Sequence, residues 1–235
     1  MIHQILQLAV EDNYIRRNIS DNLLKELKSS HHYEDSHRRA LTLPEQELFM
    51  EFLSKENSQY YHWLPIFTVM LGTGMRVGEL CALKWDDVQE DAIHIHVQQL
   101  MYKENGRNYY YVDWTKDEKG FSQGGRRFPI TIEIRNLLSE IKSVQDSLGI
   151  ESEYVFCNRE GRWIYTKAYS DCLRALCRSL GFQVTNNHAF RMSLNSNVFI
   201  PLGIPVTERA RLLGHSVETN EKYYSYARKN SMQDI

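Results

Sequence analysis

Residues 72–80 read GTGMRVGEL, and this stretch decides how the chain folds around its candidate functional residues. An apolar helix predicted over about 59–71 stops at the glycines, because glycine adopts the left-handed conformation in which helices often end. A short helix then begins near Met75 and ends before Trp85. Arg76 therefore stands at a helix start, where free N–H groups and the helix dipole favour an anion. Taken alone, the spacing favours a surface arginine at a helix end.

Two further stretches carry residue types that suit a phosphate. Residues 188–191 read HAFR, so the histidine and the arginine share one helical face. A guanidinium grips two phosphate oxygens, and an imidazole moves a proton near neutral pH. Residues 213–216 read LGHS, with two tyrosines following at 223 and 224. Considered separately, these stretches are an exposed basic face, a turn histidine and tyrosines packed on a terminal helix.

The composition is that of an ordinary globular protein. The chain has 235 residues, 42% of them hydrophobic, which is enough for one sizeable core or one domain with an appendage. It contains no apolar run of 18 residues, so no transmembrane helix is expected, and its first residues lack the pattern of a signal peptide. The cysteines form no CxxC pair, which indicates core packing in a reducing, cytoplasmic setting; they are Cys81, Cys157, Cys172 and Cys177.

The charge of the chain does not identify its partner. The formal net charge is −2, whereas nucleic-acid binders usually carry excess positive charge. The distribution is uneven, because residues 174–229 are rich in arginine and lysine. The net charge alone therefore neither indicates nor excludes a nucleic acid as the binding partner.

The spacing of apolar residues predicts an α+β fold that is mainly α-helical, with a small three-stranded antiparallel sheet. Residues 5–28 have helical spacing with an interruption at 16–20, and residues 29–40 are almost free of apolar side chains, so 1–40 form a helical segment plus a linker. The main domain occupies 41–235. Strands are expected near 93–97, 109–112 and 127–131, and helices near 44–53, 59–71, 75–84, 131–148, 166–180, 187–200, 205–213 and 217–229.

Taken together, TGMRVGEL, HAFR, LLGHS and a tyrosine nine residues after the last histidine resemble the tyrosine recombinase (phage integrase) family. The chain is most similar to integrases of phages and conjugative transposons. The resemblance covers roughly residues 41–229, in which order, spacings and flanking Gly and Leu residues agree. It implies a tyrosine-recombinase catalytic domain over 41–235. Residues 1–40 would then be a helical remnant of the core-binding domain, because 5–19 resemble that domain's last helix.

The resemblance also assigns roles to individual residues. Arg76 and Arg191 would clamp the scissile phosphate, and His188 and His215 would be the two histidines of the pocket. Tyr224 would be the nucleophile.

Two of the implied positions have alternatives. The family places a lysine in the loop between the second and third strands, where Lys116 fits best and Lys119 is a substitute; both could also be solvated loop lysines. Counting nine residues from His215 gives Tyr224, whereas counting back to a Thr-Thr-like step favours Tyr223. On a helix the two tyrosines point about 100° apart, so only one faces the pocket.

The implied reaction is the breaking and rejoining of DNA strands. Two arginines neutralise the charge of the transition state, and a tyrosine is a usable nucleophile because its phenol, with a pKa of about 10, is far more acidic than an aliphatic hydroxyl. Attack gives a 3′-phosphotyrosyl link and releases a 5′-hydroxyl. One ester replaces another, so the reaction needs no ATP, and the resemblance implies no metal ion and no other cofactor. The sequence has no HExxH, no Cys/His finger spacing and no evident acidic triad.

The expected partner is double-stranded DNA, with self-assembly as a tetramer on paired sites and no membrane. Because the family usually carries further DNA-binding domains, we expect DNA binding by this chain alone to be weak. The main alternative is a catalytically silent DNA-binding or regulatory remnant of an integrase. A topoisomerase-like strand-relaxing role and a helical protein-interaction module are further alternatives, and the last predicts no DNA contact.

Overall fold

A computed structural model describes residues 2–12, 14–18, 20, 40–56, 58–115, 124–182 and 187–224. The chain divides into two compact units, Met1–Ser36 and His37–Ile235. Within the described residues, no helix is both long and apolar enough to cross a membrane.

The first unit begins with helix α1 (Ile2–Glu11), which ends earlier than the interruption expected at 16–20. Local side-chain hydrogen bonds explain this. The Asn18 carboxamide oxygen accepts from the backbone N–H and the hydroxyl of Ser20, at 3.1 and 2.6 Å, and its amide donates to Gln7 at 3.3 Å. Such bonds compete with continued helix, and here they fold the chain back onto α1.

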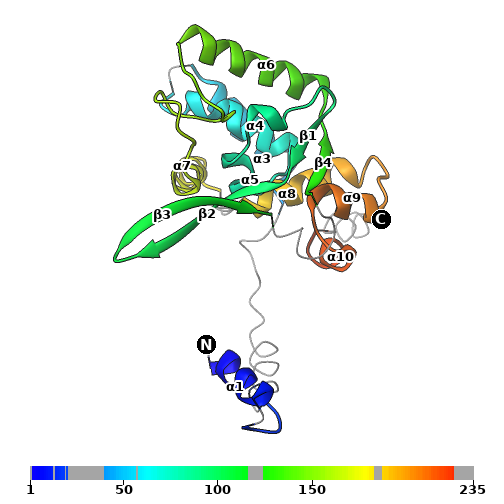
Figure 1. Cartoon of the computed structure of the whole chain (residues 1–235). Coiled ribbons are helices and arrows are strands. Elements are labelled where there is room, and N and C mark those ends of the chain that lie inside the picture. Colours follow the sequence, from blue (N-terminus) through cyan, green and yellow to red (C-terminus); the bar gives the residue numbers. More distant parts are fainter. Residues whose placement is uncertain are drawn as a thin grey trace. The chain divides into compact units, whose positions relative to one another are not determined.

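The second unit is mainly helical, with the small antiparallel strands in its middle, as expected (Figure 1). Its first elements are α3 (Leu43–Ser54), η1 (Tyr61–Trp63), α4 (Leu64–Thr73), α5 (Val77–Cys81) and η2 (Trp85–Asp87). The strands are β1 (Ala92–Ile95), β2 (Val97–Glu104), β3 (Arg107–Trp114) and β4 (Arg126–Pro129). The remaining helices are α6 (Ile132–Ser147), α7 (Thr166–Ser179), α8 (His188–Ser193), η4 (Leu194–Phe199), α9 (Val206–Leu213) and α10 (Val217–Tyr224).

The strands pair antiparallel, but as two ladders where one three-stranded sheet was expected. β1 pairs with β4, and β2 pairs with β3. His96 separates β1 from β2, so one nearly continuous stretch changes partner at that residue. The β2–β3 hairpin extends beyond the helices (Figure 1). Each ladder therefore has its own register, and β4 pairs only with β1, the part of the stretch that lies nearest the helices.

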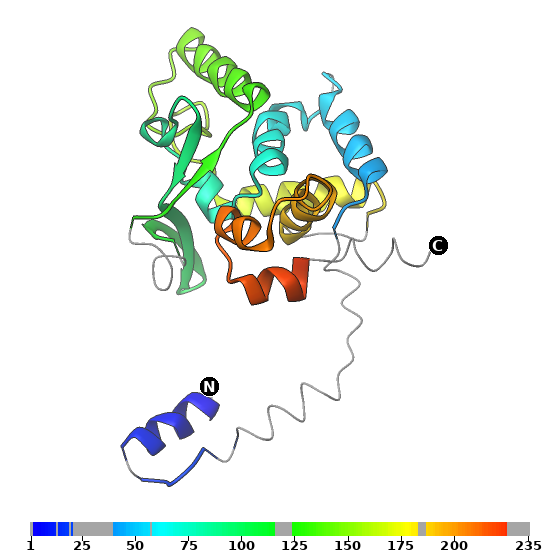
Figure 2. The ribbon, with the colours of Figure 1, turned by 90° about the vertical axis from the view of Figure 1, so that its right-hand side faces the viewer.

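The core is built around four aromatic rings from four helices. Phe67 of α4 packs edge-on against Phe49 of α3 at a centroid distance of 5.3 Å and lies 4.8 Å from Tyr169 of α7. Phe190 of α8 lies 5.4 Å from Phe49. All four side chains are buried, so α8 is held inside the unit and the residues beside Phe190 are fixed with it (Figure 2).

The start of the unit is tied to α8 by hydrogen bonds. The Ser193 hydroxyl accepts from the backbone N–H of Leu41 at 2.7 Å and donates to the carbonyl of Ala189 at 2.7 Å. The Asn197 amide donates to the Leu41 carbonyl at 2.8 Å. Thr42 then caps α3, with Glu45 accepting from the Thr42 backbone at 2.9 Å. The entry to α3 is therefore anchored on the helix that carries the HAFR stretch.

We expect Ser193→Ala to lower the free energy of unfolding by about 1–3 kcal/mol, because the buried N–H of Leu41 loses its acceptor. Ser139→Ala is the matched control: it removes the same atom from the exposed face of α6, where the hydroxyl bonds only to the Arg135 carbonyl. Urea unfolding of both variants gives the comparison. Equal stability of the two variants would contradict the anchoring role of Ser193.

Candidate active site

Arg76 is the N-cap residue of α5 and lies two residues after Gly74, the glycine that ends α4. Gly74 has a left-handed φ of 59°, and a Cβ at this position would lie 3.0 Å from the Leu213 side chain. Both facts require glycine. Arg76 itself has an extended backbone, with φ −69° and ψ 148°. The helix break and the helix start expected in residues 72–80 are confirmed.

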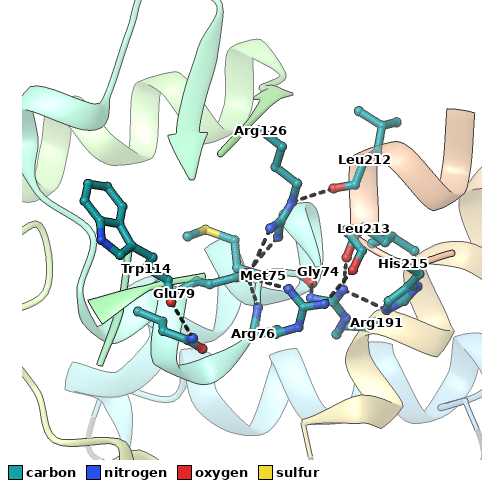
Figure 3. Close-up of polar contacts among 12 residues, drawn as sticks. Gly74, Met75, Arg76, Glu79, Trp114, Arg126, Arg191, Leu212, Leu213 and His215 are labelled. Carbon is teal, nitrogen blue, oxygen red and sulfur yellow. Dashed lines mark hydrogen bonds and ion pairs between the residues drawn. The ribbon is translucent and has the colours of Figure 1, made fainter. Parts of the chain in front are cut away.

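A fully buried carboxylate, that of Glu79, lies at the centre of the polar cluster (Figure 3). Arg126 of β4 binds both of its oxygens, with Nη1–Oε1 and Nη2–Oε2 distances of 3.0 and 2.7 Å. Arg76 donates to the same carboxylate through Nη1 and through its backbone N–H, each at 2.8 Å. Glu79 therefore orients Arg76 and the start of α5, in agreement with its position three residues after that arginine.

The surrounding charges keep Glu79 ionised. Burial alone would raise the pKa of this carboxyl, but the charge and hydrogen bonds of Arg126 and the charges of Arg76 and Arg191 outweigh burial and hold the pKa well below its usual range. A single negative charge thus lies among three positive ones.

Arg126 belongs to this candidate site, and sequence reasoning missed it. Its side chain is only 5% exposed, against 23% for Arg76, so Arg126 supports the cluster from inside and Arg76 is the one open to a ligand. Its Nε also donates to the Leu212 carbonyl of α9 at 3.0 Å. The signal was present, because Arg126 and the buried Phe128 are two positions apart in a strand and hence share its inner face.

Arg191 is the largest fully buried side chain among the described residues and is 1% exposed. Its Nη1 donates to the Gly74 carbonyl at 2.7 Å, and its Nη2 donates to the Leu213 carbonyl and contacts His215 Nε2 at 2.9 Å. Arg76 Nη2 donates to the Gly214 carbonyl at 2.5 Å. The 213–215 segment therefore touches both arginines of the expected pair.

His215 lies in this cluster as a neutral ring. Burial, and then the positive charges of Arg191, Arg76 and Arg126 with a contribution from His188, lower the pKa of His215 to about 2. A guanidinium only donates hydrogen bonds, so Nε2 is the acceptor and the ring proton belongs on Nδ1. His215 thus lies beside both arginines of the expected pair without adding charge.

Of the remaining expected residues, His188 is described by the structure, whereas the tyrosine side chains and the two lysines are not. His188 begins α8 and is exposed, and it is near enough to influence the pKa of His215. Tyr223 and Tyr224 end α10, which packs beside α9 (Figure 2), and their side chains lie outside the described part. Lys116 and Lys119 belong to residues 116–123, which also lie outside it.

The described cluster is built to attract an anion. Three guanidinium groups surround one carboxylate, an excess of two positive charges, and the neutral His215 adds none. Four regions far apart in the sequence supply them: the start of α5, β4, α8, and the segment after α9 (Figure 3). Fixed donors around a negative group are the arrangement that stabilises charge on a phosphate.

The profile of the Phage integrase family matches residues 39–230. A tyrosine recombinase XerC-like protein of Caldanaerobacter subterraneus subsp. tengcongensis is 25% identical over 175 residues, covering 69% of this chain and 44% of that protein. The ICEBs1 integrase of Bacillus subtilis is 25% identical over 245 residues, covering 100% of this chain and 61% of that protein. The chain spans about half the length of the curated relatives it matches.

Solved structures show the same fold. The Tn1549 transposon integrase in complex with transposon right end DNA matches with a TM-score of 0.77 and 20% identity, covering 99% of this chain and 76% of the other. A lambda integrase dimer bound to a COC′ core site matches with a TM-score of 0.60 and 15% identity, covering 97% and 71%.

We expect Glu79→Gln to lower the free energy of unfolding at pH 7 by about 3–5 kcal/mol, because Arg126 is left buried without its counter-charge. The loss should shrink as the pH falls below 4.5, the ordinary pKa of this carboxyl, because wild type then protonates on unfolding while the variant does not. Urea unfolding from pH 7 to pH 3 measures both effects.

The matched control for this experiment is Glu208→Gln, which removes an exposed carboxylate paired with Arg211. Exposed pairs contribute at most about 1 kcal/mol. A Glu79→Gln protein no less stable than the Glu208→Gln protein would contradict the central role of Glu79.

His215 should remain neutral, with its proton on Nδ1, from pH 8 to pH 5. Long-range 1H–15N NMR of the histidine rings measures this, and loss of the signal in His215→Gln assigns it. Because the folded-state pKa of His215 lies below the ordinary 6.5, this residue takes up a proton in the unfolded chain first as the pH falls. The contribution of His215 to the free energy of unfolding therefore decreases below pH 6.5. A His215 signal that titrates between pH 6 and 7 would contradict the burial and charges described.

Proposed function

The chain belongs to the phage integrase family, and on that premise we propose that it is a site-specific recombinase that cleaves and rejoins DNA strands through a covalent 3′-phosphotyrosine. Residues 41–235 would form the catalytic part, and residues 1–40 a remnant of a core-binding domain with a linker. The reaction would support integration or excision of a mobile element. Its substrate would be double-stranded DNA, bound by several copies of the chain assembled as a tetramer on paired sites.

The observation that carries the proposal is the meeting of Arg76, Arg191 and His215 in one cluster. They come from three separate regions, and each is in hydrogen-bond contact with the turn at 213–215 or belongs to it. A chance assortment of surface residues would leave the arginines in solvent, whereas Arg191 is buried at a cost that a structural role alone does not require.

In the proposed reaction the two arginines hold the scissile phosphate. Arg76 is the more exposed of the two and makes the first contact with the phosphate. Arg191 is buried and contributes its positive charge from the interior of the protein. We expect a bound phosphate to take over the Nη2 contact that Arg191 now makes with His215. His215 then turns its N–H toward a phosphate oxygen.

The proton transfers complete the scheme. The Tyr224 oxygen attacks phosphorus as His188 accepts the phenolic proton, and the bond to the 5′ oxygen breaks. Lys116, or Lys119 in its place, gives the leaving 5′ oxygen its proton. The number of phosphoester bonds is unchanged, so the step needs no nucleotide, and the 5′-hydroxyl of a partner strand reverses it. In this scheme the arginines supply the positive charge, so no metal ion takes part.

We would test the chemistry by incubating the protein with a randomised pool of nicked duplexes in EDTA and separating covalent protein–DNA adducts on a denaturing gel. The nick lets the short cleaved strand diffuse away, so the adduct accumulates. We expect an adduct from wild type and from Tyr223→Phe, and none from Tyr224→Phe. Arg76→Gln should form it about 10²–10³-fold more slowly, because one donor to the transition state is lost.

Arg159→Gln is the matched control for charge, because Arg159 is an exposed arginine in a loop before α7. An adduct that persists in Tyr224→Phe and disappears in Tyr223→Phe would move the nucleophile by one residue. DNA binding without any adduct would replace the proposal with a catalytically silent remnant.

A further inference from the structure

A second group of chemically suited side chains lies apart from the arginine cluster. Asp87, His94 and His96 each place one potential ligand atom within 4.8 Å of the other two. The aspartate is buried and the two histidines are half-buried. The proposed recombination reaction assigns no part to any of them.

The local structure explains why these three side chains meet. His94 and His96 flank Ile95, whose side chain is buried, so both imidazoles lie on the opposite face of the strand. Their rings stack at a centroid distance of 4.6 Å and an interplanar angle of 18°. Asp87 ends η2, which is held beside β1 by the bridge between Val88 and Ile93.

We propose that Asp87, His94 and His96 form a Zn²⁺ site that joins η2 to the strand. Two imidazoles and one carboxylate are ligands that zinc favours, and a water molecule would complete a four-coordinate ion. Ligand atoms around tetrahedral zinc lie about 3.3 Å apart, given bonds of about 2.0–2.2 Å. The separations in this group are within about 1.5 Å of that spacing, which side-chain rotation can supply.

Asp87 is already oriented for such a role. Its Oδ2 accepts from the Lys84 backbone N–H at 3.2 Å, which leaves Oδ1 directed at His96 Nε2, 2.8 Å away. An outer hydrogen bond of this kind fixes the direction of a ligating carboxylate.

The ion would have to replace existing hydrogen bonds. His96 Nε2 now contacts Asp87, and His94 Nε2 contacts the Gly124 carbonyl at 2.6 Å. Both Nε2 atoms donate to oxygen acceptors in these contacts, so each ring proton would move from Nε2 to Nδ1 when Nε2 binds the ion, and this change of tautomer releases no net proton. The Gly124 carbonyl would be set free or would approach the ion as a further oxygen ligand.

Neighbouring cations do not oppose the ion. Arg127 stands opposite His94 in the β1–β4 register, but it is paired with Asp91 at 3.0 Å. Lys84, next to η2, is paired with Glu153 at 2.8 Å.

The site is separate from the arginine cluster because the two use opposite faces of one strand. Arg126 stands opposite Ile95 in the register, and paired residues point to the same face. The ion would therefore stabilise the strand and η2 and take no part in phosphoryl transfer. Calcium or magnesium would bind more weakly, because both prefer all-oxygen sites.

The test is a zinc titration of the whole chain, stripped with EDTA and then freed of it, against a chromophoric chelator. We expect one Zn²⁺ per chain, a higher melting temperature on binding, and strong visible absorption with Co²⁺ that indicates four-coordination. His94→Gln and His96→Gln should each weaken binding at least about 100-fold, because even the loss of an outer-shell partner costs about 10–100-fold. Because both variants also lose an existing hydrogen bond, the comparison is the rise in melting temperature that zinc causes in each protein, and this rise should be absent from both variants.

The matched control is the His31→Gln/His32→Gln double variant, which removes the other closely spaced histidine pair of the chain. It should bind zinc as wild type does. Binding that is lost in the control but kept in His94→Gln and His96→Gln would overturn the proposal, and so would the lack of saturable binding. Adduct formation in EDTA tests the proposed reaction without the ion, so the two proposals fail independently.

Discussion

The buried carboxylate of Glu79 is the constraint on which the rest of the active-site geometry depends. A lone charge at this depth would be costly, so the fold must bring cations to it. Arg126 comes from a strand and Arg76 from the start of a helix, and Arg126 also holds a carbonyl at the end of α9. Replacing such an ion pair by apolar residues is often neutral for stability. In this protein the ion pair between Glu79 and Arg126 instead fixes the positions of α5, β4 and α9 relative to one another.

Besides the carboxylate of Glu79, the carbonyls at two helix ends position the arginines. Gly74 and Gly214 both adopt left-handed conformations that end α4 and α9, with φ values of 59° and 62°. Their carbonyls face Arg191 and Arg76, the two arginines of the expected pair. Carbonyls at helix C-termini carry partial negative charge, so they favour a guanidinium. The arginines are therefore positioned by the protein itself, and a ligand need not organise them.

The sequence predicted the helical framework well, because its signals are local. α3 follows from Thr42, Pro44 and Glu45, and α4 ends where the glycines require it. The location of Arg76, Arg191 and His215 in one cluster came from resemblance, since spacing alone left each as a plausible surface residue. Arg126 was missed because the third strand was expected to begin at residue 127, and because its partner, Glu79, is 47 positions away, so the strand alternation alone could not show what the arginine binds. The division of the sheet at His96 was missed for the same reason.

The alternation of His94, Ile95 and His96 was interpreted only as a strand, which is correct and incomplete. A period of two also means that two different surfaces share one strand, and here Ile95 faces the side of Arg126 while the histidines face Asp87. The expectation that the recombination chemistry needs no metal is unaffected by a metal site on the other face. What the strand pattern could not reveal is that η2 would bring a carboxylate to that face.

The net charge of −2 of the chain and the two excess positive charges of the arginine cluster bear on two different properties, the affinity for DNA and the chemistry at one phosphate. Affinity for a duplex grows with the number of phosphates that lysines and arginines neutralise over an extended surface, each releasing counterions. The chemistry depends on one phosphate held by donors that are fixed and shielded from water. A chain that lacks the first property can keep the second, because the buried arginines are balanced locally by Glu79 and by helix-end carbonyls. Weak binding of DNA by this chain would then be compatible with an intact reaction centre, and it is the covalent adduct, not affinity, that distinguishes a recombinase from a silent remnant.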